Sequence, residues 1–196
     1  MSYEIFGAGN RGPLLIMLHA AAGPDVARYR DRADNFAAHG YVILSLHYFD
    51  ATDSEKFSDN NYAAWVQAVS DLVDECRKHP GWSGRKIGLM GFSLGAMVAL
   101  AAGSQAVPVN AVAEWYGNLP DPFLEKRKTM PPLLILHGEQ DAVVQVANAR
   151  QLLSLCQTEH WTCESHFYAD QGHGFQGSAV EDAEQRTLDF FARKLQ

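Results

Sequence analysis

One short stretch places a serine where it could act as a nucleophile. The segment KIGLMGFSLGAMVALAAG puts Ser93 between Gly91 and Gly95, after an apolar run of strand length and before a helix-prone run of small residues. A glycine-rich turn that merely contains a serine is one interpretation. The other is a strand–turn–helix that holds the serine on a strained backbone, with its hydroxyl above a sheet. A serine in that setting attacks a carbonyl carbon once a base takes its proton.

A possible acid and a possible base follow Ser93 in the chain. Asp141 lies three residues after Gly138 in LLILHGEQDAVV, and His173 lies between two glycines in YADQGHGF. Both come after apolar runs, so both would reach the same edge of a parallel sheet as Ser93. The histidine would take the serine proton, and the carboxylate would orient the imidazole. Taken singly, Asp141 could be a turn or helix cap and His173 an ordinary loop histidine.

Other acids and histidines compete for these roles. Glu114, near the end of an apolar run, and Glu139 are alternative acids, whereas Asp170 shares a loop with His173 and is badly placed to support its ring. Three histidines at or near strand ends are expected to bond loop backbone rather than act as the base: His19, His47 and His137. The remaining four have no distinguishing context: His39, His79, His160 and His166.

Two backbone N–H groups are candidates to stabilise the oxyanion of such a reaction. The first belongs to Leu94, which follows the serine at the N-terminus of the next helix. The second is expected from HAAAG, the loop after the first buried run. There we assign Ala21, with Ala20 or Ala22 as alternatives and a plain small-residue turn as the simpler interpretation.

Aromatic residues on the loops after the strands predict an apolar substrate pocket, although each of them could equally belong to the core. These residues are Phe49, Trp115, Tyr116, Phe123 and Phe175. A chain of 196 residues leaves little room for a cap over such a pocket, so small substrates are expected.

The elements that must position these residues follow an alternating pattern. Six runs are continuously apolar, as is typical of parallel strands covered on both faces: residues 14–18, 41–48, 86–92, 109–116, 132–138 and 162–168. Helical patterns lie between and after them, at residues 26–40, 62–81, 96–102, 146–157 and 181–195. This order predicts an α/β fold with a mostly parallel sheet and helices on both faces, as one domain over residues 1–196.

A glycine-rich segment near the N-terminus resembles a dinucleotide-binding motif without its setting. GAGNRG, at residues 7–12, fits G-x-G-x-x-G, but a strand rather than a helix follows it. The segment is therefore predicted to be a hairpin-like turn.

Composition excludes several classes of function. A net charge of −7 argues against a nucleic-acid partner, and the longest apolar runs are far too short to span a membrane. The three cysteines, Cys76, Cys156 and Cys163, are expected to be free thiols in the cytoplasm, although Cys156 and Cys163 are close enough to pair. They lack the spacing from histidine that a zinc site would need, so no metal is expected.

With these residues in place, the chain resembles the dienelactone hydrolase family of α/β-hydrolases over nearly its whole length. The resemblance rests on LHAAAG, LHYF, MGFSLG, AEWYG, ILHGEQDAVV and YADQGHGF, and on the order Ser93, Asp141, His173. It implies an α/β-hydrolase fold without a large cap, and hydrolysis of esters or lactones without metal or organic cofactor. Two positions depart from the family: a serine replaces its nucleophilic cysteine, and Gly177 stands where an arginine would hold a substrate carboxylate.

We therefore expect a cytoplasmic monomer or homodimer that hydrolyses small esters or lactones through an acyl-enzyme, with no nucleic-acid or membrane partner. A thioesterase or a small peptidase could use the same three residues. A binding module that keeps the fold without catalysis is the alternative from another class. Failure of a fluorophosphonate to label Ser93 in the folded protein would favour that alternative.

Overall fold

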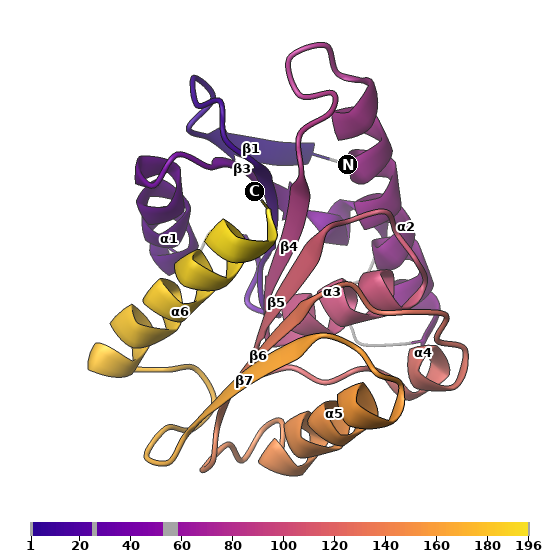
Figure 1. The fold of residues 1–196 in the computed structure, drawn as a ribbon, viewed down its shortest axis with the longest axis vertical. Coiled ribbons are helices and arrows are strands. Elements are labelled where there is room, and N and C mark those ends of the chain that lie inside the picture. Colours follow the sequence, from indigo (N-terminus) through magenta and orange to yellow (C-terminus); the bar gives the residue numbers. More distant parts are fainter. Residues whose placement is uncertain (1, 25–26, 53–58, 196) are drawn as a thin grey trace.

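A seven-stranded sheet runs through the centre of the protein (Figure 1). The structure is a computed structural model that describes residues 2–24, 27–52 and 59–195. In sheet order the strands are β1 (Ser2–Phe6), β3 (Val42–His47), β2 (Leu14–Leu18), β4 (Ile87–Phe92), β5 (Ala111–Trp115), β6 (Leu133–Gly138) and β7 (Cys163–Tyr168). β1 pairs antiparallel with β3, and all other neighbours are parallel.

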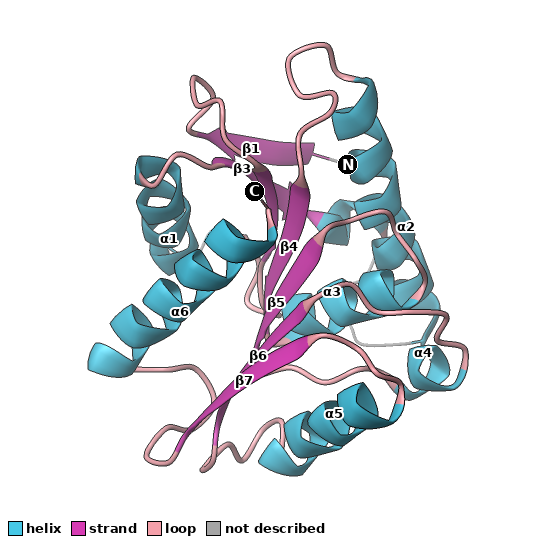
Figure 2. Cartoon of the chain, viewed as in Figure 1, coloured by secondary structure: helices cyan, strands magenta, loops and turns pink. Residues whose placement is uncertain are grey.

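Helices cover both faces of this sheet (Figure 2). α1 (Ala27–Ala38) and α6 (Ser178–Lys194) lie on one side. The other side carries α2 (Asp59–Lys78), α3 (Leu94–Ser104), α4 (Asp121–Glu125) and α5 (Val146–Thr158). A short 3-10 helix, η1 (Tyr48–Ala51), follows β3. This is the layered α/β arrangement that the alternating pattern predicts.

Each buried strand supplies two separate cores. Along β2, Leu14, Ile16 and Leu18 pack into the core beneath α2, α3 and α5, while Leu15 and Met17 pack into the core beneath α1 and α6. Successive side chains of a strand point to opposite faces, so a strand that is covered on both faces must be apolar at every position. All six predicted apolar runs are strands; five of them are almost entirely buried, whereas β7 at the edge of the sheet is half-exposed.

The N-terminal edge differs from the prediction. The sequence pattern does not predict β1, because its residues are mostly half-exposed and form no continuous apolar run. The GAGNRG segment does turn, with the Asn10 N–H donating to the Gly7 carbonyl at 2.9 Å. However, the prediction of a hairpin-like turn is wrong, because β3 lies between the two strands that the turn connects.

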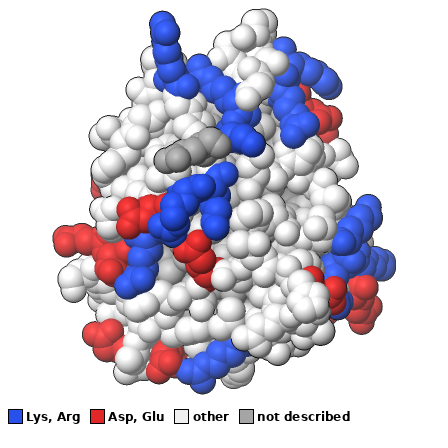
Figure 3. Space-filling view, viewed as in Figure 1, with Lys and Arg blue, Asp and Glu red and all other residues white. Residues whose placement is uncertain are grey.

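Charged side chains of both signs share the surface. Figure 3 shows Lys and Arg over the upper part and centre of one face, with Asp and Glu beside several of them. The ion pairs of the described residues include Arg193 with Glu164 and Arg186 with Asp182, each at 2.6 Å. Among the described residues, none of the helices is long and apolar enough to cross a membrane.

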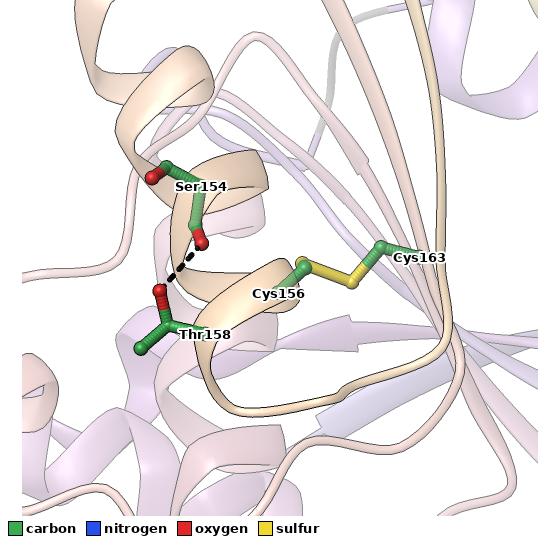
Figure 4. The surroundings of a disulfide bond; sticks show 4 residues. All are labelled: Ser154, Cys156, Thr158 and Cys163. Carbon is green, nitrogen blue, oxygen red and sulfur yellow. Dashed lines mark hydrogen bonds between the residues drawn. A yellow bond between two sulfur atoms is a disulfide. The ribbon is translucent and has the colours of Figure 1, made fainter.

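The prediction that all three cysteines are free is wrong for two of them. Cys156, near the end of α5, and Cys163, at the start of β7, form a disulfide with their Cα atoms 6.2 Å apart (Figure 4). Cys76 is a free thiol, and burial is the main cause that raises its pKa to about 12. Because disulfides are rare in reducing compartments, the argument from free thiols to the cytoplasm no longer holds.

The disulfide gives a first testable expectation. It closes a loop with a sequence separation of only 7, for which chain entropy predicts about 2–3 kcal/mol of stabilisation. Thiol titration of denatured, unreduced protein should find one thiol per chain, and reductant should lower the midpoint of urea unfolding. A Cys156→Ala/Cys163→Ala variant is the control, because its midpoint should not respond to reductant. Three titratable thiols in the unreduced protein would contradict the pairing.

Candidate active site

Ser93 occupies the turn between the central strand β4 and helix α3. Its backbone has φ 51° and ψ −115°, outside the regions that side-chain-bearing residues prefer. Such a conformation costs of order 1–3 kcal/mol and persists only where the surroundings impose it. The Ser93 N–H donates to the Trp115 carbonyl of the neighbouring strand at 3.0 Å, and the Ser93 carbonyl accepts from Met97 in α3. The serine is thus fixed from both sides.

Two glycines make this turn possible, because backbone atoms occupy the space of a side chain. A Cβ on Gly91 would lie 2.3 Å from the carbonyl oxygen of Gly95. A Cβ on Gly95 would lie 2.2 Å from the carbonyl oxygen of Leu18 and 2.5 Å from that of His19. The first turn of α3 therefore packs directly against the backbone at the end of β2.

The structure brings the three predicted catalytic side chains into one chain of contacts. The Ser93 Oγ lies 2.8 Å from Nε2 of His173, and the His173 Nδ1 lies 2.8 Å from Oδ2 of Asp141. Since a carboxylate only accepts, Nδ1 carries the proton and Nε2 is left to accept the serine proton. The ring of Tyr116 packs edge-on against the imidazole, with centroids 5.1 Å apart.

The carboxylate of Asp141 is buried but well supplied with donors. Its Oδ1 accepts from the backbone N–H groups of Val143 and Val144, both at 2.8 Å. Its Oδ2 accepts from His173 and also lies 3.4 Å from Nε2 of His137. Such bonds replace the water that burial removes, so a negative charge can be held inside the protein.

His137 bonds loop backbone, as the sequence predicts, and it also lies beside the carboxylate of Asp141. It is fully buried, and its Nε2 lies 2.8 Å from the Val144 carbonyl, so Nε2 carries the proton and donates. Burial lowers the pKa of this imidazole, which keeps it neutral. His137 thus braces the turn that supplies donors to Asp141. Its place one residue before Gly138, at the end of β6, was the available signal.

The competing acids have other partners. Glu139 is paired with Arg150 at 2.8 Å, and Asp170 accepts from the side chain of Gln171. Glu114 is fully buried in β5, where its Oε2 accepts the Gly117 N–H at 2.8 Å. Burial is the main cause that raises its pKa to about 8, with a smaller contribution from Asp141. This acid is neutral at pH 7 and holds the turn beside Tyr116 rather than the imidazole.

The expected oxyanion donors lie on the two segments that meet at Gly95. Leu94 is the first residue of α3, so its N–H is at the positive end of the helix dipole. The Ala20 N–H donates to the hydroxyl of Tyr29 at 3.1 Å, so this group already has an acceptor. Ala21 and Ala22 follow it in an exposed turn.

The predicted pocket aromatics are mostly core. Trp115 has no exposed surface, and its indole N–H donates to Thr187 on α6 at 3.0 Å, so its assignment to the pocket is wrong. The cause is strand alternation, which turns Trp115 toward α6. Tyr116 and Phe175 are buried and pack against each other, with Tyr116 also touching His173. Phe49 packs against His19 on the other face of the sheet, in the core beneath α2 and α3.

In the described part of the chain, no cluster of three or more histidine, cysteine or acidic side chains could hold a metal ion. The contact between the Ser93 Oγ and Nε2 of His173 suits proton transfer from the hydroxyl and attack by the serine oxygen on an electrophile.

Known proteins resemble this chain in sequence and in fold. Residues 3–195 match the dienelactone hydrolase family. Acyl-coenzyme A thioesterase 1 of Mus musculus is 29% identical over 130 residues, covering 61% of this chain and 30% of the thioesterase. Carboxymethylenebutenolidase of Pseudomonas putida is 28% identical over 153 residues, covering 70% and 64%. The chain thus spans less than two thirds of the length of these curated relatives.

A solved structure confirms the predicted fold. The crystal structure of esterase PE8 aligns with a TM-score of 0.76 at 19% identity, covering 99% of both chains. The fold is that of an α/β-hydrolase with a mostly parallel sheet, and the described residues contain no large cap.

The close contact at Gly95 can be tested by adding one methyl group. Gly95→Ala would force α3 away from the carbonyl oxygens of Leu18 and His19, so we expect a loss of about 3 kcal/mol in the free energy of unfolding. The control is Gly9→Ala, whose Cβ would meet nothing within 4 Å. Urea unfolding of both variants measures the difference. Equal stabilities would mean that the backbone contact is not close.

Glu114 predicts a specific dependence of stability on pH. Its pKa is about 8 in the folded protein and near its usual value of 4.5 when unfolded, so only the folded state keeps the proton between these values. Raising the pH through this window therefore favours unfolding, by about 1.4 kcal/mol per pH unit. Glu114→Gln should lack this loss and gain stability relative to wild type from pH 5 to 8. Exposed Glu139→Gln is the control, and parallel curves for Glu114→Gln and wild type would refute the buried neutral acid.

Proposed function

The chain belongs to the dienelactone hydrolase family, and we propose that it is a serine hydrolase of small carboxylic esters or lactones. The observation that carries this proposal is the chain of 2.8 Å contacts from the Ser93 hydroxyl through His173 to Asp141. A hydroxyl, an imidazole and a buried carboxylate in this order are the parts of acyl transfer.

In the first step, Oγ of Ser93 attacks the carbonyl carbon of the ester while Nε2 of His173 takes its proton. Asp141 holds the imidazole in the required tautomer and stabilises its protonated form. The resulting oxyanion accepts from the N–H of Leu94 and from the N–H of Ala21. Each such donor contributes about 3–4 kcal/mol to stabilisation of the transition state. The C–O bond then breaks, and His173 gives its proton to the leaving alkoxide.

In the second step, water attacks the acyl group on Ser93. His173 takes a proton from the water and returns it to the serine oxygen as the acid leaves. With a lactone, the alcohol released in the first step stays attached to the acyl group, so the product is a hydroxy acid. No metal or organic cofactor takes part in either step.

The departures from the family bear on the substrate. Gly177 caps α6 with φ 57° and has no side chain to hold a carboxylate. Arg30 is paired with Glu4, and the Arg28 guanidinium lies over the Tyr29 ring, 5.6 Å from its centroid. Gln176, the neighbour of Gly177, is polar but carries no charge. We therefore favour neutral ester or lactone substrates over dienelactone itself.

A thioesterase is the second candidate, because relatives named acyl-coenzyme A thioesterases match 61% of this chain. The same acyl-enzyme would form, with a thiolate as leaving group. Rates on a matched panel of a short p-nitrophenyl ester, a lactone and an acyl-coenzyme A thioester would separate the two candidates. Monomer or homodimer state, cytoplasmic location and the absence of nucleic-acid or membrane partners stay predictions.

The role of Ser93 can be tested directly. Ser93→Ala should lower turnover of short p-nitrophenyl esters by at least about 10³-fold and abolish labelling by a fluorophosphonate, because no nucleophile remains. Ser83→Ala, in the exposed turn before β4 and so at the other end of that strand from Ser93, should leave both unchanged. Turnover and labelling of Ser93→Ala equal to wild type would refute the mechanism. A folded wild-type protein that resists the probe would favour a binding module.

A further inference from the structure

The loop after β2 is held by three side chains that the mechanism above does not use. His19 follows the last residue of β2, and only 1% of it is exposed. Its Nδ1 lies 2.8 Å from the carbonyl oxygen of Ala20. The Tyr48 hydroxyl donates to the His19 carbonyl at 2.8 Å, and the Tyr29 hydroxyl accepts the Ala20 N–H at 3.1 Å. Hydrogen bonds with these side chains therefore fix the orientation of the peptide groups on both sides of Ala20.

These contacts fix the tautomer of His19. A carbonyl oxygen only accepts, so Nδ1 must carry the proton that is donated to Ala20. The ring is held in that orientation by stacking on Tyr48, with centroids 4.3 Å apart and planes 14° apart, and by the edge contact with Phe49. The His19 ring is thus a rigid donor aimed at one backbone oxygen.

Holding the carbonyl of Ala20 also aims the N–H of Ala21. The two groups belong to one planar trans peptide, in which the C=O and N–H point in opposite directions. The Ala20 carbonyl accepts from His19 and from the Gly23 N–H at 3.0 Å, so the Ala21 N–H is directed away from both. The preceding N–H, that of Ala20, is occupied by Tyr29. Ala21 is therefore the first residue of this loop whose N–H faces away from these contacts.

The loop also lies against the nucleophile turn. Gly95 admits no Cβ because the carbonyl oxygens of Leu18 and His19 occupy its space. One backbone contact therefore positions both expected oxyanion donors. The Leu94 N–H lies directly before Gly95, and the Ala21 N–H lies two residues after His19, whose carbonyl oxygen contacts Gly95.

From these contacts we propose that His19 is a positioning residue for the oxyanion hole, and that Tyr29 and Tyr48 assist it. His19, as its Nδ1–H tautomer, holds the Ala20–Ala21 peptide so that the Ala21 N–H meets the developing oxyanion without reorganisation. The inference rests on the proposed hydrolase function, which it deepens. It predicts that the proton on Nδ1, rather than the bulk of the ring, is what matters.

Three substitutions at His19 separate these possibilities. Asparagine places an amide N–H close to the position of Nδ1, glutamine places its amide near that of Nε2, and alanine removes both. With a short p-nitrophenyl ester, His19→Ala and His19→Gln should lower kcat by about 10- to 100-fold and change KM by less than about threefold. His19→Asn should stay within about threefold of wild type in kcat. Thermal unfolding identifies the variants that fold.

Tyrosine variants keep the proposal testable if His19→Ala does not fold. Tyr29→Phe and Tyr48→Phe keep their rings and lose only the hydroxyl, and should lower kcat by a smaller factor, about three- to tenfold. Tyr41→Phe is the matched control, because Tyr41 precedes β3, which runs parallel to β2, and so lies at the opposite end of these strands from the loop after β2. Wild-type kcat in folded His19→Ala, or equal losses in the asparagine and glutamine variants, would overturn the proposal.

A second measurement is independent of activity. Amide hydrogen exchange at Gly23 and Ala20, followed by NMR, should accelerate in His19→Ala and return toward wild type in His19→Asn. If wild-type protein hydrolyses no ester or thioester, the proposed function fails. Hydrogen exchange then still tests whether His19 holds the Ala20–Ala21 peptide. Unchanged exchange in His19→Ala would then overturn the positioning role by itself.

Discussion

The close backbone contact around Gly91 and Gly95 is the constraint on which the site depends. It lets β4 pass into α3 within a single strained residue, and it seats the first turn of α3 on the end of β2. The strain at Ser93 is offset by the packing of α3, of whose eleven residues ten are buried. A helix with so little exposed surface cannot rotate to relax the turn. Ser93 is therefore held by the core rather than by its own loop.

Two buried carboxyl groups close to this turn show how environment sets their roles. Asp141 accepts two backbone N–H groups and the His173 Nδ1–H, so its charge is compensated. Glu114 accepts only the Gly117 N–H, and its Oε1 contacts no donor among the described residues. Burial consequently raises the pKa of Glu114 to about 8. The charged acid orients the imidazole, and the neutral one braces the turn beneath Tyr116, whose ring contacts that imidazole.

How far the sequence predicts this protein depends on how local each signal is. Six strands follow from continuous apolar runs, and Ser93, Asp141 and His173 follow from their loops and order, because each signal lies within a few residues. The pairing of Cys156 with Cys163 depends on where α5 ends relative to β7, which is a tertiary fact. The assignment of Trp115 to the pocket is wrong, although the alternation of side chains along β5 would have placed it in the core beneath α6. The contacts that hold the Ala20 peptide join three separate segments, so no local pattern could reveal them.

The strands that lead to Ser93 and to His173 differ in burial. Ser93 follows the central strand β4, whereas His173 follows β7, an edge strand with half-exposed residues. Two contacts attach β7 and the loop after it to the neighbouring elements. A Cβ on Gly138 would lie 2.3 Å from the Gln171 carbonyl oxygen, so the loop of His173 packs on the end of β6. At the other end of β7, the disulfide joins it to α5, the helix after Asp141. Asp141 and His173 thus lie on elements that are linked to each other at both ends. They can therefore keep their mutual geometry, even though their side of the sheet is less buried than the centre that holds Ser93.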